Sequence, residues 1–375
     1  MTKQPPKLPL YCDASPGLSK APTDGHAGLW YERFFDRYRE DWSLWDNSKQ
    51  DWIATVAGDD TKGRACGSSE NTLTAAADRQ RELIRALGGE PRCFKTEWRF
   101  VTGLGLPHPV ENGFLWHPTL GVPYLPGATV KGLVRSWVEV WDKLDEDDKL
   151  NEKARRARLK FWFGSEGKEP EYAENFMTGG FIFFDALPVT PPCLVADVMT
   201  PHMGKWYAQG SDIGNIAAEP EKVPADWHDP VPVPFLVVRD ASFLFGIAPR
   251  PHPDPVVRQR MVDELPDVLD ALKNALDWLG AGAKTAVGYG RFVEDVSTDD
   301  LTPWVLERIK ELAKKDNSNE ETVLRGKQLA LLWSALEEGE EKNRARKGIK
   351  AYWRNKGWWD KPPSKKMRDA RKIYE

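Results

Sequence analysis

The sequence predicts an α+β fold in which four strands and two helices alternate as βαβ, an insertion and a second βαβ. Period-two hydrophobicity marks the strands, and a period of 3.6 marks the helices. In chain order these patterns cover residues 94–101, 129–144, 179–187, 235–247, 265–279 and 291–296. This order is that of the ferredoxin-like (RRM-like) βαββαβ fold, whose antiparallel sheet carries both helices on one face and leaves the other free. A doubly wound parallel sheet would need more βα units than this chain contains.

The first βαβ unit has the clearest local signals. Apolar and charged residues alternate along 94–101, and the segment 179–187 is apolar enough to be covered on both faces. Thr129 is placed to cap the first helix. The buried face expected for that helix comprises Val130, Leu133, Val134, Trp137, Trp141 and Leu144.

The insertion between the two units, residues 190–231, is rich in proline and has no strong hydrophobic period. No regular element is therefore expected there. A long irregular segment inside a compact domain is usually functional or mobile.

The remaining chain divides into two extensions around a core at 92–298. Residues 1–91 are predicted to form a helical extension with helices near 29–39 and 73–87. Residues 299–375 are predicted to form a second, basic helical extension. Its expected helices begin at Thr302-Pro303, a capping pair, and cover about 320–338.

The composition of the chain excludes several classes of protein, including disordered and membrane-spanning ones. Of the 375 residues, 41% are hydrophobic and 29% are charged, which is typical of a globular protein and not of a disordered chain. No window approaches the roughly 18 apolar residues of a membrane span. The N-terminus has no secretory pattern, so a cytoplasmic protein without membrane contact is expected. The four cysteines lack zinc-type spacing, and neither a metal site nor a cofactor is expected.

Charge is distributed unevenly along the chain. The formal net charge is −4, yet residues 341–375 contain thirteen Lys/Arg and only four Asp/Glu. Such a tail is typical of a segment that meets phosphate or an acidic partner. Its aromatic residues leave two interpretations open. They stack on the bases of single-stranded RNA, or they pack on the protein core or a partner beneath a solvated helix face.

A turn rich in glycine and proline leads into the first helix, and residues 121–135 have the sequence GVPYLPGATVKGLVR. The N–H groups and dipole of a helix N-terminus favour an anion. Lys131 and Arg135 lie one turn apart on one helix face, so both can reach a phosphate backbone. The alternative is a helix with two solvated basic residues.

A glycine-rich loop precedes the last strand, and residues 280–292 have the sequence GAGAKTAVGYGRF. Glycines allow close backbone approach, and Lys284 and Thr285 can hold a phosphate oxygen. The loop is neither a Walker A loop nor a GxGxxG motif. Its end is similar to the RNP1 motif of RNA-recognition domains, with Arg291 as an extra residue. An ordinary glycine turn is the alternative.

Together, the two motifs resemble those of the RAMP superfamily of CRISPR proteins, which are ferredoxin-like RNA binders. The pattern G-x-P-Y-[IL]-P-G-[SA]-[ST]-x-K-G-x-x-R enters the first helix, and the glycine-rich loop comes late in the core. Segments 103–113 and 197–207 are similar to those of one branch, the sixth subunit of the Cmr (type III-B) effector complex. The resemblance covers about residues 92–298.

This resemblance implies a structural subunit that binds CRISPR guide RNA and caps the RAMP filament near the 3′ part of the guide. Its implied partners are the first, fourth and fifth Cmr subunits and, through the guide, target RNA, in defence against foreign nucleic acid. The proline-rich insertion would be the thumb of the RAMP core. Phosphate contacts and base stacking suit binding that is independent of sequence. The residues implied to contact RNA are Lys131, Arg135, His202, Lys205, Trp206, Tyr207, Gly282, Lys284, Thr285 and Arg291.

No catalytic group is expected, but one enzymatic alternative stays open: a stand-alone RAMP endoribonuclease that processes the CRISPR RNA precursor. Cleavage through the 2′-hydroxyl needs a general base and acid within reach of the RNA. His108 and His117 flank the motif that enters the first helix and are the candidates. Structural hydrogen bonds are the other explanation for them. A third possibility is a subunit that binds only proteins.

Overall fold

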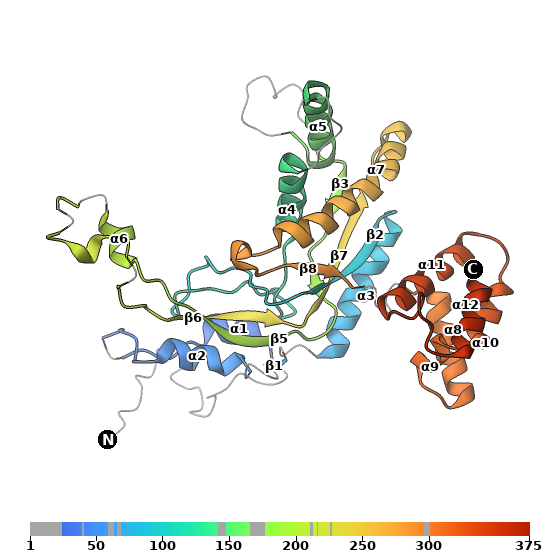
Figure 1. Cartoon of the computed structure of the whole chain (residues 1–375), viewed down its shortest axis with the longest axis horizontal. Helices are drawn as coiled ribbons and strands as arrows, with labels where there is room; N and C mark the ends of the chain where they lie inside the picture. The colour runs from blue at the N-terminus through green and yellow to red at the C-terminus, as the bar shows by residue number, and fades with distance from the viewer. Residues whose placement is uncertain are drawn as a thin grey trace. The chain divides into compact units, whose positions relative to one another are not determined.

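The computed structural model describes residues 25–39, 41–58, 64–65, 69–141, 148–165, 177–210, 213–215, 217–225, 227–295 and 301–375. The chain divides into two compact units. The sheet unit is drawn from Met1–Pro91 and Lys95–Val293, and the C-terminal unit from Arg92–Phe94 and Glu294–Glu375 (Figure 1). Among the described helices, none combines the length and the hydropathy that a membrane span requires.

The main sheet has the strand order β3-β7-β2-β8, with β4 beside β7. Its strands are β2 (Glu90–Thr96), β3 (Phe181–Phe183), β4 (Leu187–Pro188), β7 (Ser242–Pro249) and β8 (Phe292–Glu294). β3 and β4 both pair with β7 in antiparallel orientation. The prediction of a mixed α and β fold with antiparallel sheets is therefore confirmed.

Both faces of β7 are covered. Phe243 and Phe245 are fully buried, and their rings lie 5.7 and 5.8 Å from the ring of Phe292. Gly246, the residue after Phe245, faces the opposite side of the sheet because side chains alternate along a strand. On that side lies Ile84 of α3 (Glu70–Ala86), whose Cδ1 would be 2.1 Å from a Cβ at position 246. The expectation of a free sheet face is therefore wrong around β7, since α3 covers it.

Helices α4 (Gly127–Val140) and α7 (Pro255–Asn274) connect the strands and pack against each other. α7 begins well before the predicted residue 265, because Asp254 accepts a hydrogen bond from the N–H of Val256 and Pro255 occupies the first helical position. At its end α7 continues into a π-helical turn, η5 (Ala275–Leu279), which packs on α4. The charged helix α5 (Asp148–Phe163) follows α4 and packs on it.

A second sheet has the order β1-β5-β6, formed by β1 (Arg64–Ala65), β5 (Cys193–Met199) and β6 (Val233–Arg239). β5 and β6 pair in antiparallel register from Cys193↔Arg239 to Met199↔Val233 and form the β5–β6 hairpin. The expectation of no regular element in 190–231 is therefore wrong at 193–199. β5 lacks the usual alternation because Leu194 and Val195 are its only two buried residues and are adjacent, so its pairing with β6 defines the strand.

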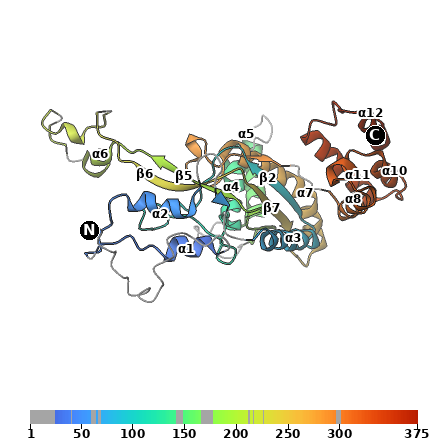
Figure 2. The same ribbon diagram turned by 90° about the horizontal axis from the view of Figure 1, so that it is seen from below.

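The outer part of the β5–β6 hairpin carries two short helical segments. They are α6 (Gly204–Gln209) and the 3₁₀ turn η4 (Pro220–Lys222), which contact each other. Figures 1 and 2 both show the hairpin carrying α6 away from the main sheet.

The N-terminal part contains α1 (Ala27–Arg33), α2 (Ser48–Val56) and α3. Two of these three helices were predicted, whereas α2 was not. The indole of Trp30 on α1 stacks at 5.7 Å on that of Trp52 on α2, and α2 packs on β5 and β6. The helical spacing of Leu73, Ala76 and Leu83 predicts that Leu83 is buried on α3, but it is exposed, and Arg81 is buried instead, in an ion pair with Asp78. A guanidinium that pairs with a carboxylate on the preceding turn can be buried where hydrophobicity alone would not place it.

In the part of the C-terminal unit that the structure describes, five helices follow residue 300: α8 (Pro303–Asp316), α9 (Glu320–Leu324), α10 (Lys327–Ser334), α11 (Glu340–Asn355) and α12 (Lys365–Tyr374). Thr302 caps α8 as predicted, by accepting a hydrogen bond from the N–H of Val305. The helix predicted over 320–338 is instead divided at Gly326, whose backbone is extended.

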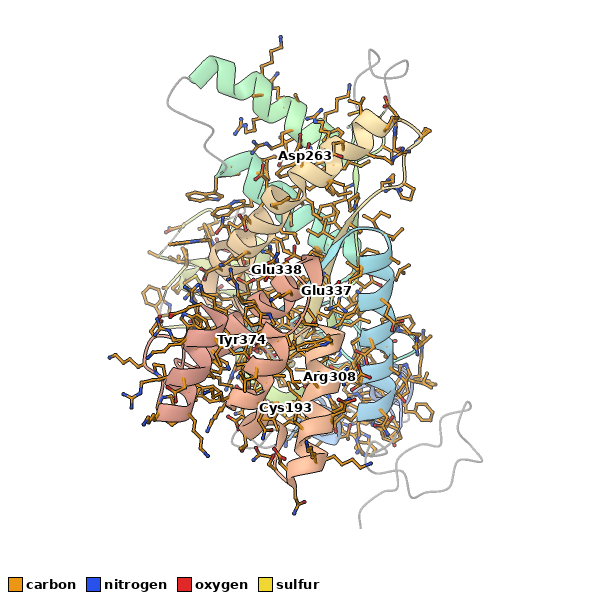
Figure 3. All side chains as sticks on the ribbon, turned by 90° about the vertical axis from the view of Figure 1, so that its right-hand side faces the viewer. Cys193, Asp263, Arg308, Glu337, Glu338 and Tyr374 are labelled. Atoms are coloured by element: carbon orange, nitrogen blue, oxygen red, sulfur yellow. The ribbon has the colours of Figure 1, made fainter. Side chains whose placement is uncertain are left out.

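One hydrophobic core joins all five helices of the C-terminal unit. Tyr374, labelled in Figure 3, lies among these helices and is fully buried. Tyr352, Trp353 and Trp359 of the basic tail are also buried in this core, and Trp358 is partly buried against it. The aromatic residues of the tail therefore pack inside the protein, which was one of the two interpretations.

Candidate nucleic-acid interface

The N-terminus of α4 already has an anionic partner within the chain. The carboxylate of Asp185 accepts a hydrogen bond of 2.6 Å from the N–H of Gly127, the first residue of α4. Thr129 makes no capping bond, and the N-cap position is occupied by Pro126. The prediction that Thr129 caps the helix is therefore wrong, since the cap comes from a residue far along the chain. Because the first N–H group of α4 is already hydrogen-bonded, an external anion near this helix would be bound mainly by side chains of α4.

Lys131 lies one turn into α4 in a cluster of positive charges, the α4 cation cluster, formed by Lys131, Arg135 and Arg250. Partial burial, together with the charges of Arg250 and Arg135, lowers the pKa of Lys131. Within the described part of the chain, no hydrogen bond or ion pair holds its ammonium group. Like charges held together repel each other and favour the binding of an anion between them.

The two arginines of this cluster are held in place by neighbouring groups. Arg135 donates through Nε to the carboxylate of Glu139, one turn along α4, at 2.6 Å. Arg250 directly follows β7, is exposed, and donates through Nε to the carbonyl of Gly179 at 3.0 Å. Arg250 was not among the predicted site residues. Its position directly after the apolar run 243–249 is the sequence signal that could have found it.

Backbone hydrogen bonds join the glycine-rich loop to the segment that follows β2. The N–H of Ala283 donates to the carbonyl of Val101 at 2.9 Å, and the N–H of Gly290 donates to the carbonyl of Arg99 at 2.8 Å. Gly282 has φ +90°, and a Cβ on it would lie 2.2 Å from the Val101 carbonyl oxygen. The close backbone approach predicted for this loop is therefore real, and its partner is the protein's own backbone.

Lys284 stands at the bend of this loop, in a left-handed conformation with φ 59°. Its ammonium group lies 5.4 Å from the ring centre of Phe235 on β6 and 6.0 Å from that of Tyr289. No carboxylate pairs with it among the described residues. Thr285 follows it, half-buried, and begins the 3₁₀ turn η6 (Thr285–Val287). Lys284 is thus a cation held by aromatic faces.

Arg291 has a different environment. Its guanidinium lies 2.8 Å from the carboxylate of Glu97 and 2.8 Å from that of Asp277. The hydrogen bond and charge of Asp277, with the charge of Glu97, raise the pKa of Arg291. Its charge is therefore compensated within the protein, in contrast to those of Lys131 and Lys284.

The four hairpin residues predicted to contact RNA lie on or next to α6, and Figures 1 and 2 show that α6 is remote from α4. His202 and Lys205 are exposed, and Tyr207 is 81% exposed. The Trp206 ring packs on Gly210, where a Cβ would lie 2.3 Å away. These residues form a group separate from the α4 cation cluster.

The two motifs lie on elements that touch, because η5 packs on α4 and leads directly into the glycine-rich loop at Gly280. The charges that act on Lys131 are those of Arg250 and Arg135, and Lys284 is not among them. That Lys131 and Lys284 both contact the same RNA therefore stays a prediction.

Both candidate catalytic histidines are engaged by the protein backbone. His108 stacks on Tyr31 at 4.3 Å, and its Nε2 lies 2.9 Å from the carbonyl oxygen of Tyr31. His117 accepts hydrogen bonds at Nδ1 from the N–H groups of Thr119 and Leu120. Burial lowers the pKa of both imidazoles. Among the residues that the structure describes, no group of three His, Cys, Asp or Glu side chains is placed to hold a metal ion.

Comparison with known proteins identifies the family. A model of the RAMP superfamily matches residues 93–293, more than half of the chain. The CRISPR system Cmr subunit Cmr6 of Pyrococcus furiosus is 30% identical over 57% of this chain and 71% of the relative. The chain belongs to the RAMP superfamily, as a Cmr6-like member. Cmr6 of Saccharolobus solfataricus is 28% identical over 48% of each of the two chains.

Two solved structures are also similar to this RAMP protein. One chain of a cryo-EM structure of the type III-B Cmr-β bound to cognate target RNA has 20% identity and a TM-score of 0.44, over 66% of this chain and 71% of that chain. The crystal structure of Cmr6 from Pyrococcus furiosus has 26% identity and a TM-score of 0.30, over 55% of this chain and 98% of that chain.

The RAMP match ends at residue 293, and the C-terminal unit contains everything from Glu294 onward. Helices α8 to α12 therefore lie outside the matched region. The α4 cation cluster, the glycine-rich loop and the β5–β6 hairpin lie inside it.

Proposed function

We propose that this RAMP protein is a guide-RNA-binding structural subunit of a type III-B Cmr effector complex. It caps the RAMP filament near the 3′ part of the guide, next to the first, fourth and fifth subunits, and meets target RNA through the guide. The complex acts in the cytoplasm against foreign nucleic acid. Support comes from the similarity to the Cmr6 subunit of Pyrococcus furiosus, which extends over 71% of that relative.

The observation that carries the RNA-binding proposal is the ammonium group of Lys131, which has no hydrogen-bond or ion-pair partner among the described residues and feels the charges of Arg250 and Arg135. Burial first, and then the charges of Arg250 and Arg135, lower the pKa of Lys131, so the two arginines repel the ammonium group. A phosphate backbone relieves that repulsion, and binding of this kind does not depend on base sequence. Lys284, on the glycine-rich loop, would provide a second phosphate contact.

We also propose that the core is ferredoxin-like and that the β5–β6 hairpin is the thumb. The four main strands occur in the chain as β2, β3, β7 and β8, and their sheet order β3-β7-β2-β8 is 2-3-1-4 in those terms. This interleaved order is that of the ferredoxin-like fold, in which the two strands of each βαβ unit are separated by a strand of the other unit. The hairpin leaves the core between β4 and β7, and its outer part holds the proline-rich segment.

The proposed role is non-catalytic. The backbone hydrogen bonds and burial of His108 and His117 favour a structural role for both imidazoles. To test this, the purified chain would be incubated with labelled repeat RNA without metal, and intact RNA is expected. Site-specific cleavage that His108→Ala or His117→Ala abolishes would support the endoribonuclease alternative instead.

The RNA contacts are tested with the double variant Lys131→Ala/Lys284→Ala, by titrating the full chain with a labelled single-stranded guide RNA at several salt concentrations. Each phosphate contact contributes about 0.7 to the slope of log affinity against log salt, so the slope should fall by about 1.4. Lys310→Ala, which removes an exposed lysine of the C-terminal unit, is the matched control. An unchanged slope in the double variant would exclude these lysines as phosphate ligands.

A further inference from the structure

Three segments meet at the base of the β5–β6 hairpin. Arg99, which follows β2, approaches the Oδ2 atom of Asp197 on β5 to 2.5 Å. The hydroxyl of Tyr289 in the glycine-rich loop donates to the same oxygen. These three residues, the hairpin-base triad, tie the hairpin to the loop and to the end of β2.

The charges of the triad balance one another. Burial acts to raise the pKa of Asp197, but the hydrogen bonds from Tyr289 and Arg99 outweigh it, so the pKa lies below its usual value. Burial and the Asp197 carboxylate raise the pKa of Tyr289 to about 12. Asp197 is therefore ionised and Tyr289 neutral near pH 7. The ring of Tyr289 is consequently held by its hydroxyl in one orientation.

Trp98 rests on this fixed ring and yet stays open to solvent. Its indole lies 4.9 Å from the ring centre of Tyr289, and the guanidinium carbon of Arg99 lies 5.4 Å from the indole centre. Phe94, Thr96 and Phe100, which share its alternation, are buried, whereas Trp98 is 49% exposed. A half-exposed indole that rests on a fixed ring leaves part of its apolar surface in water, where a base can stack on it.

A cation without a carboxylate partner among the described residues adjoins the same aromatic ring. The ammonium group of Lys284 lies 6.0 Å from the ring centre of Tyr289, which Trp98 also contacts. An exposed aromatic face beside a cation on a glycine bend is the combination with which proteins bind single-stranded nucleic acid. It supplies stacking for a base of any identity and a positive charge for the adjacent phosphate.

We propose that Trp98 stacks on a base of single-stranded RNA whose backbone meets Lys284. This inference rests on the proposed function and adds to it a base-contacting residue that phosphate binding alone does not require. The hairpin-base triad holds the stacking surface rigid before RNA binds. A surface that is rigid in the free protein loses little conformational entropy when the ligand docks.

The test compares Trp98→Ala, Trp98→Phe and Trp98→Leu in the full chain, titrated with oligo-U and oligo-A. Losing one base stack should weaken binding of both RNAs by roughly five- to 150-fold for Ala. The Trp98→Phe variant should retain most of the RNA affinity, because a phenyl ring can still stack on a base. The Trp98→Leu variant should not, although it also keeps an apolar side chain against Tyr289. The salt slope should stay at its wild-type value, since no phosphate contact is removed. The control is Trp278→Ala, because Trp278 is 76% exposed and makes no ring contact in the described part of the chain.

The outcomes separate this inference from the proposed function. If the wild-type chain binds no RNA at any salt concentration, both fail. If the wild type binds and Trp98→Leu binds equally well, only the stacking role is overturned. Normal RNA affinity with impaired assembly of Trp98→Leu into a multi-subunit complex would also overturn it, because Trp98 would then be a protein contact. Photocrosslinking of 4-thiouridine RNA to the peptide that contains Trp98 is the expected positive result.

Discussion

The sheet unit and the C-terminal unit use the same residue types, cations and aromatics, in opposite ways. In the sheet unit, Trp98 is half exposed and Lys284 lies over aromatic faces at a bend of the glycine-rich loop. In the C-terminal unit, Trp353 is fully buried and its indole N–H donates to the carbonyl of Leu324. The comparison teaches that basic and aromatic residues close together in sequence indicate RNA stacking only where the aromatic faces lie outside the core.

Cations in the C-terminal unit cover aromatic residues from the solvent side. The ammonium group of Lys350 lies 5.0 Å from the Trp359 ring centre, and the Arg371 guanidinium carbon lies 5.5 Å from it. Long basic side chains often lay their aliphatic stems on apolar surface and keep the charge in water. Most of the positive charge of the tail is therefore a solvated surface over a packed core.

Among single substitutions, the largest effect on stability is expected for Trp353→Ala. Removing a fully buried tryptophan from a core typically costs about 3–5 kcal/mol, so the C-terminal unit should unfold at a lower temperature. Calorimetry of the full chain should show that one transition moves. Tyr374→Phe is the control, because the buried hydroxyl of Tyr374 has no hydrogen-bond partner among the described residues and its loss should be neutral.

Deleting residues 341–375 extends this test. The segment provides α12, most of α11 and several buried residues of the same core, so the rest of the C-terminal unit should unfold while the sheet unit stays folded. A chain without 341–375 that keeps every thermal transition would contradict the packed tail.

A smaller loss of stability is expected for Gly282→Ala. The positive φ and the clash with the Val101 carbonyl should together cost about 2–4 kcal/mol and should weaken RNA binding. Gly288→Ala is the matched control, since Gly288 has φ +93° but nothing within 4 Å of its Cβ position. Thermal unfolding and RNA titration of both variants measure the difference. Equal behaviour of the two would show that the backbone approach at Gly282 is unimportant.

The hairpin-base triad should give stability that depends on pH. Because the folded pKa of Asp197 is lowered, its contribution is present above the ordinary carboxyl pKa of 3.8 and is lost as pH falls through the folded value. Asp197→Asn should therefore destabilise the protein by about 1.5–3 kcal/mol at pH 7 and by less at pH 3. Urea unfolding at the two pH values measures this. Tyr289→Phe keeps both charges but removes the strongest of the hydrogen bonds that lower the pKa of Asp197, so it should lose part of the pH dependence and keep the part due to Arg99.

The smallest effect on stability is expected for reversing exposed charges of the tail. Lys361, Lys365, Lys366 and Arg368 are exposed, and exposed substitutions usually change stability by within about 0.5 kcal/mol each. Changing all four to Glu should instead alter RNA affinity or assembly, because the surface charge falls by eight units. A large drop in the unfolding temperature would show that these charges belong to the packing of the unit.

Local sequence patterns predicted many of the regular elements and both motifs. The interiors of α3, α4 and α7 repeat their apolar residues with helical period, and this pattern predicted that the three helices form. It did not fully predict their buried faces, because Leu83 on α3 and Trp141 at the end of α4 are exposed. The glycine-rich loop was recognisable because few residues other than glycine adopt positive φ at several nearby positions. Lys131 and Lys284 could be identified as candidates because each follows a turn that is recognisable from its glycine residues.

The environment of each site residue depended on segments that are distant in sequence. Asp185 caps α4, Arg250 joins Lys131, and Asp277 neutralises Arg291, and in each case the two partners come from different elements. The burial of the tail aromatics was likewise decided by packing among five helices. The sequence alone determined the alternation of strands and helices in the core and the family, because both depend on the spacing of residues that are close together in the chain. The tertiary structure decided which charges are paired, because pairing depends on distances that only the folded chain sets.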